Sequence, residues 1–171
     1  MSATAKKRKA KAAVSVAGRI GHKRSDMRYR DETGTEWASK LESDVYEWLT
    51  RNAASARKAE SGRDSVAYQT AVRGGTCGEC GCTRILQNHT YTPDIFAVDA
   101  WPNKPGPVTL EVKGFLRAKD KRILRAVVKA GVISNMCLLF GRRHDKTVEW
   151  AKKFLPGVAL GIFAKGTIEA I

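Results

Sequence analysis

The sequence predicts an α/β fold in which a mixed sheet is flanked by helices. Strand-like and helix-like stretches alternate along the second half of the chain, which is the order that builds a sheet covered by helices. Of the 171 residues, 43% are hydrophobic, enough to bury the core of one domain. Two apolar strand-like segments also flank a short proline-rich stretch, which predicts an antiparallel hairpin.

A first amphipathic helix is predicted from Thr35 to Arg51, where apolar side chains recur at helical spacing. Glu42 falls at one edge of the apolar stripe, beside Leu49, and Asp44 borders the other edge. An acid at the edge of such a stripe can face a cleft, although most acids on amphipathic helices are solvated.

The later elements are predicted from the alternation of apolar and polar residues and from Gly and Pro, which interrupt helices and strands. Strands are predicted at residues 65–72, 91–98, 108–115, 133–140 and 158–164. Helices are predicted at residues 118–130, ended by Gly131, and at 146–155, ended before Pro156. Residues 74–83 form a glycine-rich and cysteine-rich loop, and residues 99–107 form the turn of the hairpin.

The chain carries a formal net charge of +14, from 31 Lys and Arg against 17 Asp and Glu. Such an excess is typical of proteins that bind polyanions, and nucleic acid is the first candidate. Residues 1–30 are small and basic, so we expect a flexible tail, solvated or in contact with phosphates, before a folded domain at 31–171. No signal peptide and no membrane-spanning apolar run is found, so a cytoplasmic protein without membrane contact is expected.

Three of the four cysteines crowd into one loop, as Cys77, Cys80 and Cys82. Their spacing is not that of a secreted disulfide framework. A structural Zn²⁺ site needs four nitrogen or sulfur ligands, and His89, Cys137 or a ligand from a second chain would complete one. Three unpaired thiols in a reducing cytosol are the alternative interpretation.

Two acids and one lysine on the predicted hairpin carry the chemical hypothesis. Successive side chains of a strand alternate between faces, so Glu111 and Lys113 share one face. Asp94 follows Pro93 on the neighbouring strand and is expected near Glu111. Close carboxylates repel each other unless a positive charge lies between them, which predicts a hard cation, Mg²⁺ with Mn²⁺ as the alternative. Lys113 would then stabilise a phosphate or help to deprotonate a water.

A structural interpretation of the same residues is also open. Asp94 and Glu111 would pair with surface lysines, and Lys113 would protect an edge strand against aggregation.

The pattern Pro93-Asp94…Glu111-Val112-Lys113 resembles the PD-(D/E)XK nuclease superfamily. Within it, NHTYTPDI (residues 88–95) and EVKG (111–114) resemble the phage endonuclease I family of the T-seven type, which are Holliday junction resolvases. The Ser-x-Leu-Glu helix motif of that family, which supplies a catalytic acid, is matched by residues 39–42. The resemblance runs from about Trp37 to the C-terminus.

This resemblance implies a restriction-endonuclease-like core and four catalytic residues: Glu42, Asp94, Glu111 and Lys113. The three acids among them would hold the metal. It implies a domain-swapped homodimer that exchanges elements through residues 65–72. Each centre would then take Glu42 from one chain and its other residues from the partner. Such a dimer would resolve four-way DNA junctions by paired hydrolysis that leaves 5′-phosphates, in the cytoplasm of the bacterial host of a phage.

The chain departs from the family pattern in two places. The cysteine loop is not part of the family motif, and the hairpin is longer, so that its tip from Trp101 to Pro107 would contact DNA or a neighbouring chain. Basic residues that follow Lys113 and the next strand are expected to bind phosphates: Lys119, Lys121, Arg122, Arg125, Arg142 and Arg143.

Two other functions fit the sequence. A restriction-like or mismatch endonuclease would use the same site on duplex DNA. A zinc-containing nucleic-acid-binding protein would use the basic surface without catalysis.

Overall fold

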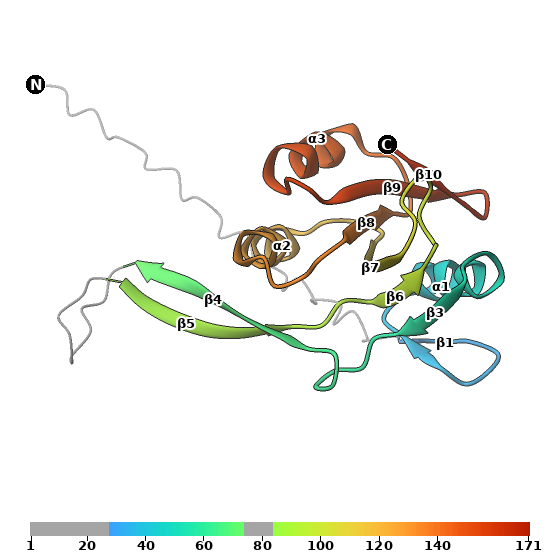
Figure 1. Cartoon of the computed structure of the whole chain (residues 1–171), viewed down its shortest axis with the longest axis horizontal. Helices are drawn as coiled ribbons and strands as arrows, with labels where there is room; N and C mark the ends of the chain where they lie inside the picture. The colour runs from blue at the N-terminus through green and yellow to red at the C-terminus, as the bar shows by residue number, and fades with distance from the viewer. Residues whose placement is uncertain (1–27, 74–83) are drawn as a thin grey trace, which may run out of the picture.

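The computed structural model describes residues 28–73 and 84–171, and its body is a mixed six-stranded sheet with three helices (Figure 1). The strands lie in the order β10-β9-β8-β7-β6-β3. Their bounds are Thr167–Ala170 (β10), Ala159–Ala164 (β9), Met136–Phe140 (β8), Pro107–Lys113 (β7), Ile95–Val98 (β6) and Ser55–Lys58 (β3). Strands β7, β8 and β9 are parallel and the other neighbours are antiparallel. The predicted α/β class with a mixed sheet is confirmed.

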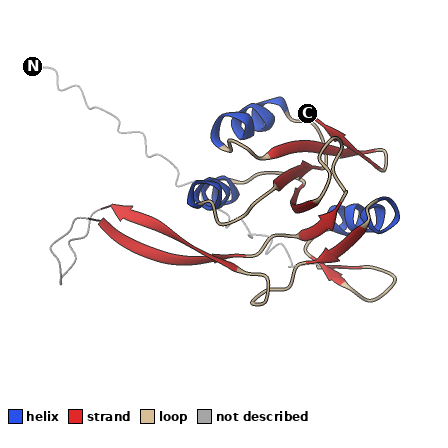
Figure 2. Ribbon diagram, in the orientation of Figure 1, coloured by secondary structure: helices blue, strands red, loops and turns tan. Residues whose placement is uncertain are grey.

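The helices cover both faces of this sheet (Figure 2). Helix α1 (Lys40–Asn52) packs on one face, and α2 (Ala118–Ala130) and α3 (Asp145–Phe154) pack on the other. Strand β8 is buried on both sides, so all five of its residues are apolar. Its Cys137 lies in the core on the α1 face, fully buried, and burial raises the pKa of its thiol to about 11. Cys137 is therefore a packing residue and not an accessible zinc ligand.

The first helix begins later than the periodicity predicts. Glu36–Trp37 form a short strand, β2, which pairs with β1 (Tyr29–Arg30). Ser39 ends this extended segment as the N-cap of α1, because its hydroxyl accepts a hydrogen bond from the Glu42 backbone N–H. Trp37 is buried in the core and packs there from this strand.

The strand predicted at residues 91–98 is divided in two. Pro93 has no N–H to donate, so the ladder breaks there and the chain changes partners. Before the break, β5 (Arg84–Tyr91) pairs with β4 (Val66–Arg73) in a two-stranded arm that projects from the body (Figure 1). After the break, β6 enters the main sheet. The predicted strand at 65–72 corresponds to β4, but β5, β3 and β10 were not predicted.

Two predictions concern residues outside the described ranges. These are most of the basic tail, residues 1–27, and the cysteine loop at 74–83. The last two residues assigned to the tail belong to β1. Within residues 28–73 and 84–171, no helix has the length and apolar character needed to cross a membrane.

Trp101, in the long β6–β7 connection, is only 6% exposed and packs against Gly161 on β9. It is a core residue, so the expectation that Trp101 contacts DNA or another chain is wrong. A Cβ at Gly161 would lie 2.6 Å from the Trp101 ring and 3.1 Å from the Glu169 carbonyl oxygen.

Gly161→Ala should therefore destabilise the fold by about 1–3 kcal/mol, because the rigid indole and the backbone must both move. Thermal or urea unfolding measures the change. Gly114→Ala is the control, since its Cβ would lie at an ordinary 3.9 Å from the Leu41 side chain. Equal stability of the two variants would contradict the close packing of Trp101 on Gly161.

Candidate active site

The hairpin of β6 and β7 brings Asp94 to the end of β7. The two strands are antiparallel, with Ile95 opposite Leu110, so the residue before β6 lies beside the last residues of β7. The Asp94 backbone N–H donates to the Leu110 carbonyl at 3.2 Å, and Asp94 Oδ2 accepts from the Val112 N–H at 2.7 Å. Two backbone contacts thus fix the Asp94 carboxylate against β7.

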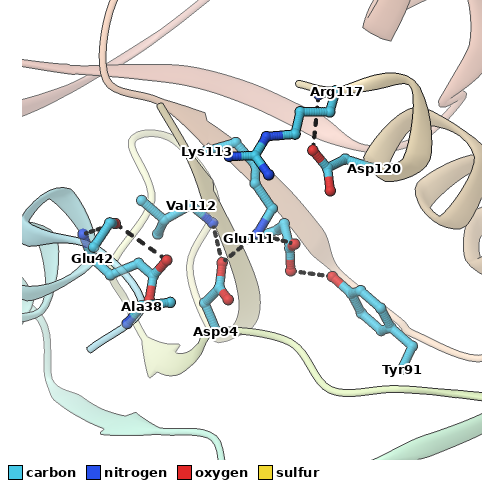
Figure 3. Close-up of polar contacts among 10 residues, drawn as sticks. Ala38, Glu42, Tyr91, Asp94, Glu111, Val112, Lys113, Arg117 and Asp120 are labelled. Atoms are coloured by element: carbon cyan, nitrogen blue, oxygen red, sulfur yellow. Dashed lines mark hydrogen bonds and ion pairs between the residues drawn. The ribbon is translucent and has the colours of Figure 1, made fainter. Parts of the chain in front are cut away.

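Lys113 lies between the two carboxylates of the hairpin (Figure 3). Its Nζ is 2.6 Å from Glu111 Oε1 and 3.3 Å from Asp94 Oδ2. The prediction that Glu111 and Lys113 share a face is confirmed by this contact. Strand β7 lies between β6 and β8 and is not an edge strand. The interpretation that Lys113 protects an edge strand against aggregation is therefore wrong.

Glu42 reaches the same region from α1 (Figure 3). This helix packs on the face of the sheet opposite to α2 and α3. Glu42 is 7% exposed, and its carboxylate accepts hydrogen bonds from the Ser39 hydroxyl at 3.3 Å and the Ala38 N–H at 3.2 Å. Burial and the charge of Asp94 raise the pKa of Glu42, and the charge of Lys113 opposes this shift. The neighbouring Asp44 instead pairs with Lys40 on the surface, at 2.6 Å.

Burial and neighbouring charges together set the protonation of Glu111 and Lys113. It raises the pKa of Glu111 above its usual range, as does the nearby Asp94, while Lys113 and Tyr91 oppose the shift. Burial lowers the pKa of Lys113, but the charges of Glu111 and Asp94 outweigh it and the pKa is raised. Lys113 is therefore held as an ammonium ion, which favours electrostatic stabilisation over the acceptance of a proton.

Tyr91 is a site residue that the sequence did not single out. Its hydroxyl donates a hydrogen bond to Glu111 Oε2, and the residue is 8% exposed (Figure 3). Burial and the charge of Glu111 raise the pKa of Tyr91, so its hydroxyl stays protonated as a donor. Its only signal in the sequence is its place in the NHTYTPDI stretch.

The carboxylates fit a hard cation by their chemistry, since Mg²⁺ prefers oxygen ligands. Within the described residues, no three His, Cys, Asp or Glu side chains are grouped closely enough to form a metal site. The positive charge between Asp94 and Glu111 is that of Lys113, at the place where the sequence predicted a metal. Binding of a cation by Asp94 and Glu111 therefore requires the Lys113 ammonium to move aside.

A cleft of about 1040 Å³ opens beside two of the site residues. Glu42 and Asp94 line it, together with Thr92, Lys58 and Arg117. Lys113 contacts Asp94 from the strand beneath. Glu42 and Asp94 thus face a space large enough to admit a polymer backbone, whereas Glu111, 4% exposed, and Lys113 do not line it.

The predicted phosphate-binding residues lie in three places. Lys119 and Arg122 line a hollow of about 1200 Å³ between α2 and the arm. Lys121 lies 5.0 Å from the Trp150 ring centre, and Arg125 lies 4.5 Å from that of Phe154. Exposed Arg142 and Arg143 follow β8, whose last residue is opposite Lys113 in register. Lys121 and Arg125 of α2 thus lie over aromatic rings of α3.

His89, proposed as a zinc ligand, is engaged within the arm. Its Nε2 lies 2.8 Å from the Thr70 hydroxyl, and its ring stacks on Tyr68 at 5.1 Å between centres. The three loop cysteines lie outside the described residues, so the zinc prediction remains a prediction.

Comparisons of the chain with protein-family models, curated proteins and solved structures found no match.

Proposed function

We propose that the chain is a metal-dependent, structure-selective DNA endonuclease of the PD-(D/E)XK type that resolves four-way junctions. The observation that carries this proposal is the convergence of Asp94, Glu111 and Lys113 within ion-pair distance, beside the buried Glu42. The net charge of +14 supports a polyanionic substrate.

The residues of the site have distinct roles in this proposal. Asp94 and Glu111 would hold Mg²⁺ or Mn²⁺, which would supply a water of lowered pKa and neutralise charge on the phosphate. Glu42 would complete the set only by moving closer, since the three carboxylates are not grouped at metal-ligand distance in the structure. Val112 holds one oxygen of Asp94, which orients the carboxylate. Lys113 remains protonated and stabilises the negative charge that develops on the phosphate.

We also propose that the active form is a homodimer with exchanged arms. One chain supplies all four site residues in the structure, and Glu42 lies before the arm in sequence while Asp94, Glu111 and Lys113 lie after it. If β4 of one chain paired with β5 of a second chain, every residue pair between the two strands of the arm would be the same as in the single chain. Each site would then combine two chains without any change in its contacts.

The test of the proposed function is a comparison of cleavage on a four-way junction and on its separate linear arms, with Mg²⁺ present and withheld. We expect Mg²⁺-dependent cuts on opposed strands of the junction and little cutting of the arms. Equal cleavage of the arms would favour a duplex nuclease. Binding without cleavage, together with zinc held by thiols, would favour a non-catalytic binding protein.

Tyr91→Phe should weaken the metal site without removing it. The variant loses only the hydroxyl that orients Glu111, and such supporting contacts typically change metal affinity by about 10-fold to 100-fold. We expect the Mg²⁺ concentration for half-maximal cleavage to rise by that factor, with most of the rate recovered at saturation.

Tyr68→Phe is the matched control, because Tyr68 is equally buried at the arm but stacks on His89 instead. Identical Mg²⁺ titrations for both variants and the parent would show that the Tyr91 hydroxyl does not position Glu111.

A further inference from the structure

Arg117 directly precedes α2 and lines the cleft that contains Glu42 and Asp94. Figure 3 shows its side chain extending from the start of α2 towards Lys113. The Asp120 carboxylate accepts a hydrogen bond from the Arg117 backbone N–H at 2.8 Å. This contact with the first turn of α2 fixes the Arg117 backbone, from which the guanidinium extends beside the site.

The other basic side chains at the cleft are engaged. Arg28 lies 3.3 Å from a carboxylate oxygen of Glu36. Lys58 donates to the Glu36 carbonyl and lies 4.5 Å from the centre of the Trp37 ring. In the part of the chain that the structure describes, no carboxylate lies within ion-pair distance of the Arg117 guanidinium, which leaves its charge available to a ligand.

The cleft needs such a charge if it binds an anionic polymer. Its carboxylates repel phosphate, and the ammonium of Lys113 is shared between Glu111 and Asp94. A guanidinium forms two parallel hydrogen bonds with a phosphate, a geometry that an ammonium lacks.

We propose that Arg117 binds a backbone phosphodiester of the DNA strand that is cut, next to the scissile phosphate. This inference rests on the proposed nuclease function and adds to it a substrate-binding residue outside the Asp-Glu-Lys constellation. Arg117 positions the DNA strand, while the carboxylates and Lys113 act on its scissile phosphodiester bond.

Arg117→Gln and Arg117→Lys in the full chain test this assignment. Loss of one charge-assisted contact should lower kcat/KM for the junction by about 10-fold to 100-fold in Arg117→Gln. In a Glu111→Gln background, which separates binding from cleavage, the slope of log Kd against log salt should fall by about 0.9. Arg117→Lys should keep the slope but not the full rate, since it keeps only the charge.

Arg51→Gln is the control for charge alone. Arg51 is exposed in the last turn of α1, at the end opposite to Glu42, and pairs with Glu47. We expect the cleavage rate and the salt slope of Arg51→Gln to match those of the parent chain.

Junctions with single uncharged methylphosphonates locate the bound phosphate. At the phosphate that Arg117 contacts, the substitution should slow the parent but have no further effect on Arg117→Gln, because the two changes remove the same interaction. Additive losses at every phosphate near the cut would overturn the inference.

Two further results separate this inference from the proposed function. A parent chain that cuts junctions, with Arg117→Gln equal to it in rate and salt slope, overturns the role of Arg117 alone. So does a slower Arg117→Gln that has a lower unfolding temperature and an unchanged slope, because Arg117 would then act on the fold. A parent that neither binds nor cuts junctions overturns both.

Discussion

Glu111→Gln should abolish Mg²⁺-dependent junction cleavage while leaving junction binding almost unchanged. The substitution keeps the shape of a side chain that is 4% exposed but removes the charge that would hold the cation. We expect the single-turnover rate to fall by at least about 1000-fold, which corresponds to about 4 kcal/mol of transition-state stabilisation. Lys113→Ala should lower the rate by at least about 100-fold, because it removes the ammonium that would stabilise the phosphate.

Binding should survive both substitutions because, in the proposed function, exposed basic residues outside the site would hold most phosphates. Glu149→Gln on the exposed face of α3 is the matched control and should cut like the parent. Thermal unfolding must be measured as well, since Glu111 contacts both Lys113 and Tyr91. A Glu111→Gln chain that cuts within about 10-fold of the parent would contradict the proposed role of Glu111.

Two inactive chains should recover activity when they are mixed, if dimers exchange their arms. In a heterodimer of Glu42→Ala and Asp94→Ala chains, one site carries both changes and the other carries neither. Random exchange of an equal mixture would leave about a quarter of all sites intact. Denaturing gels of a labelled junction should then show nicks in one strand, whereas each variant alone shows none.

A second mixture provides the control. Asp94 and Glu111 both follow the arm in sequence, so Asp94→Ala and Glu111→Ala chains cannot complete a site in any pairing. Nicking in this control would show that the assignment of residues to the two halves is wrong. If verified heterodimers of the first mixture did not nick, each site would be built from a single chain.

Local pattern was sufficient for several features of the fold. Periodicity and breaker residues predicted α2 and α3 almost to their ends, and the two apolar segments around a proline-rich turn predicted the β6–β7 hairpin. Alternation along β7 predicted that Glu111 and Lys113 share a face. These features depend on residues close together in sequence, so a short window contains the information.

Other features could not be read in this way. The polar residues of β5 obscured a strand that forms by pairing with β4, outside the main sheet. Trp101 looked available for a ligand because its turn is rich in polar and proline residues, yet it packs against Gly161 from a distant strand. Both outcomes depend on partners that lie far away in the sequence.

By itself, the sequence determined the class of the fold, the charge of the surface and the pairing of an acid with a lysine on one strand. Only the tertiary structure decided that Glu42 approaches from the opposite face, that Lys113 lies between two carboxylates, and that Tyr91 and Arg117 adjoin them. The physical reason is that backbone geometry sets the direction of a side chain locally, whereas the packing of α1, the arm and α2 around the end of the sheet sets which side chains meet.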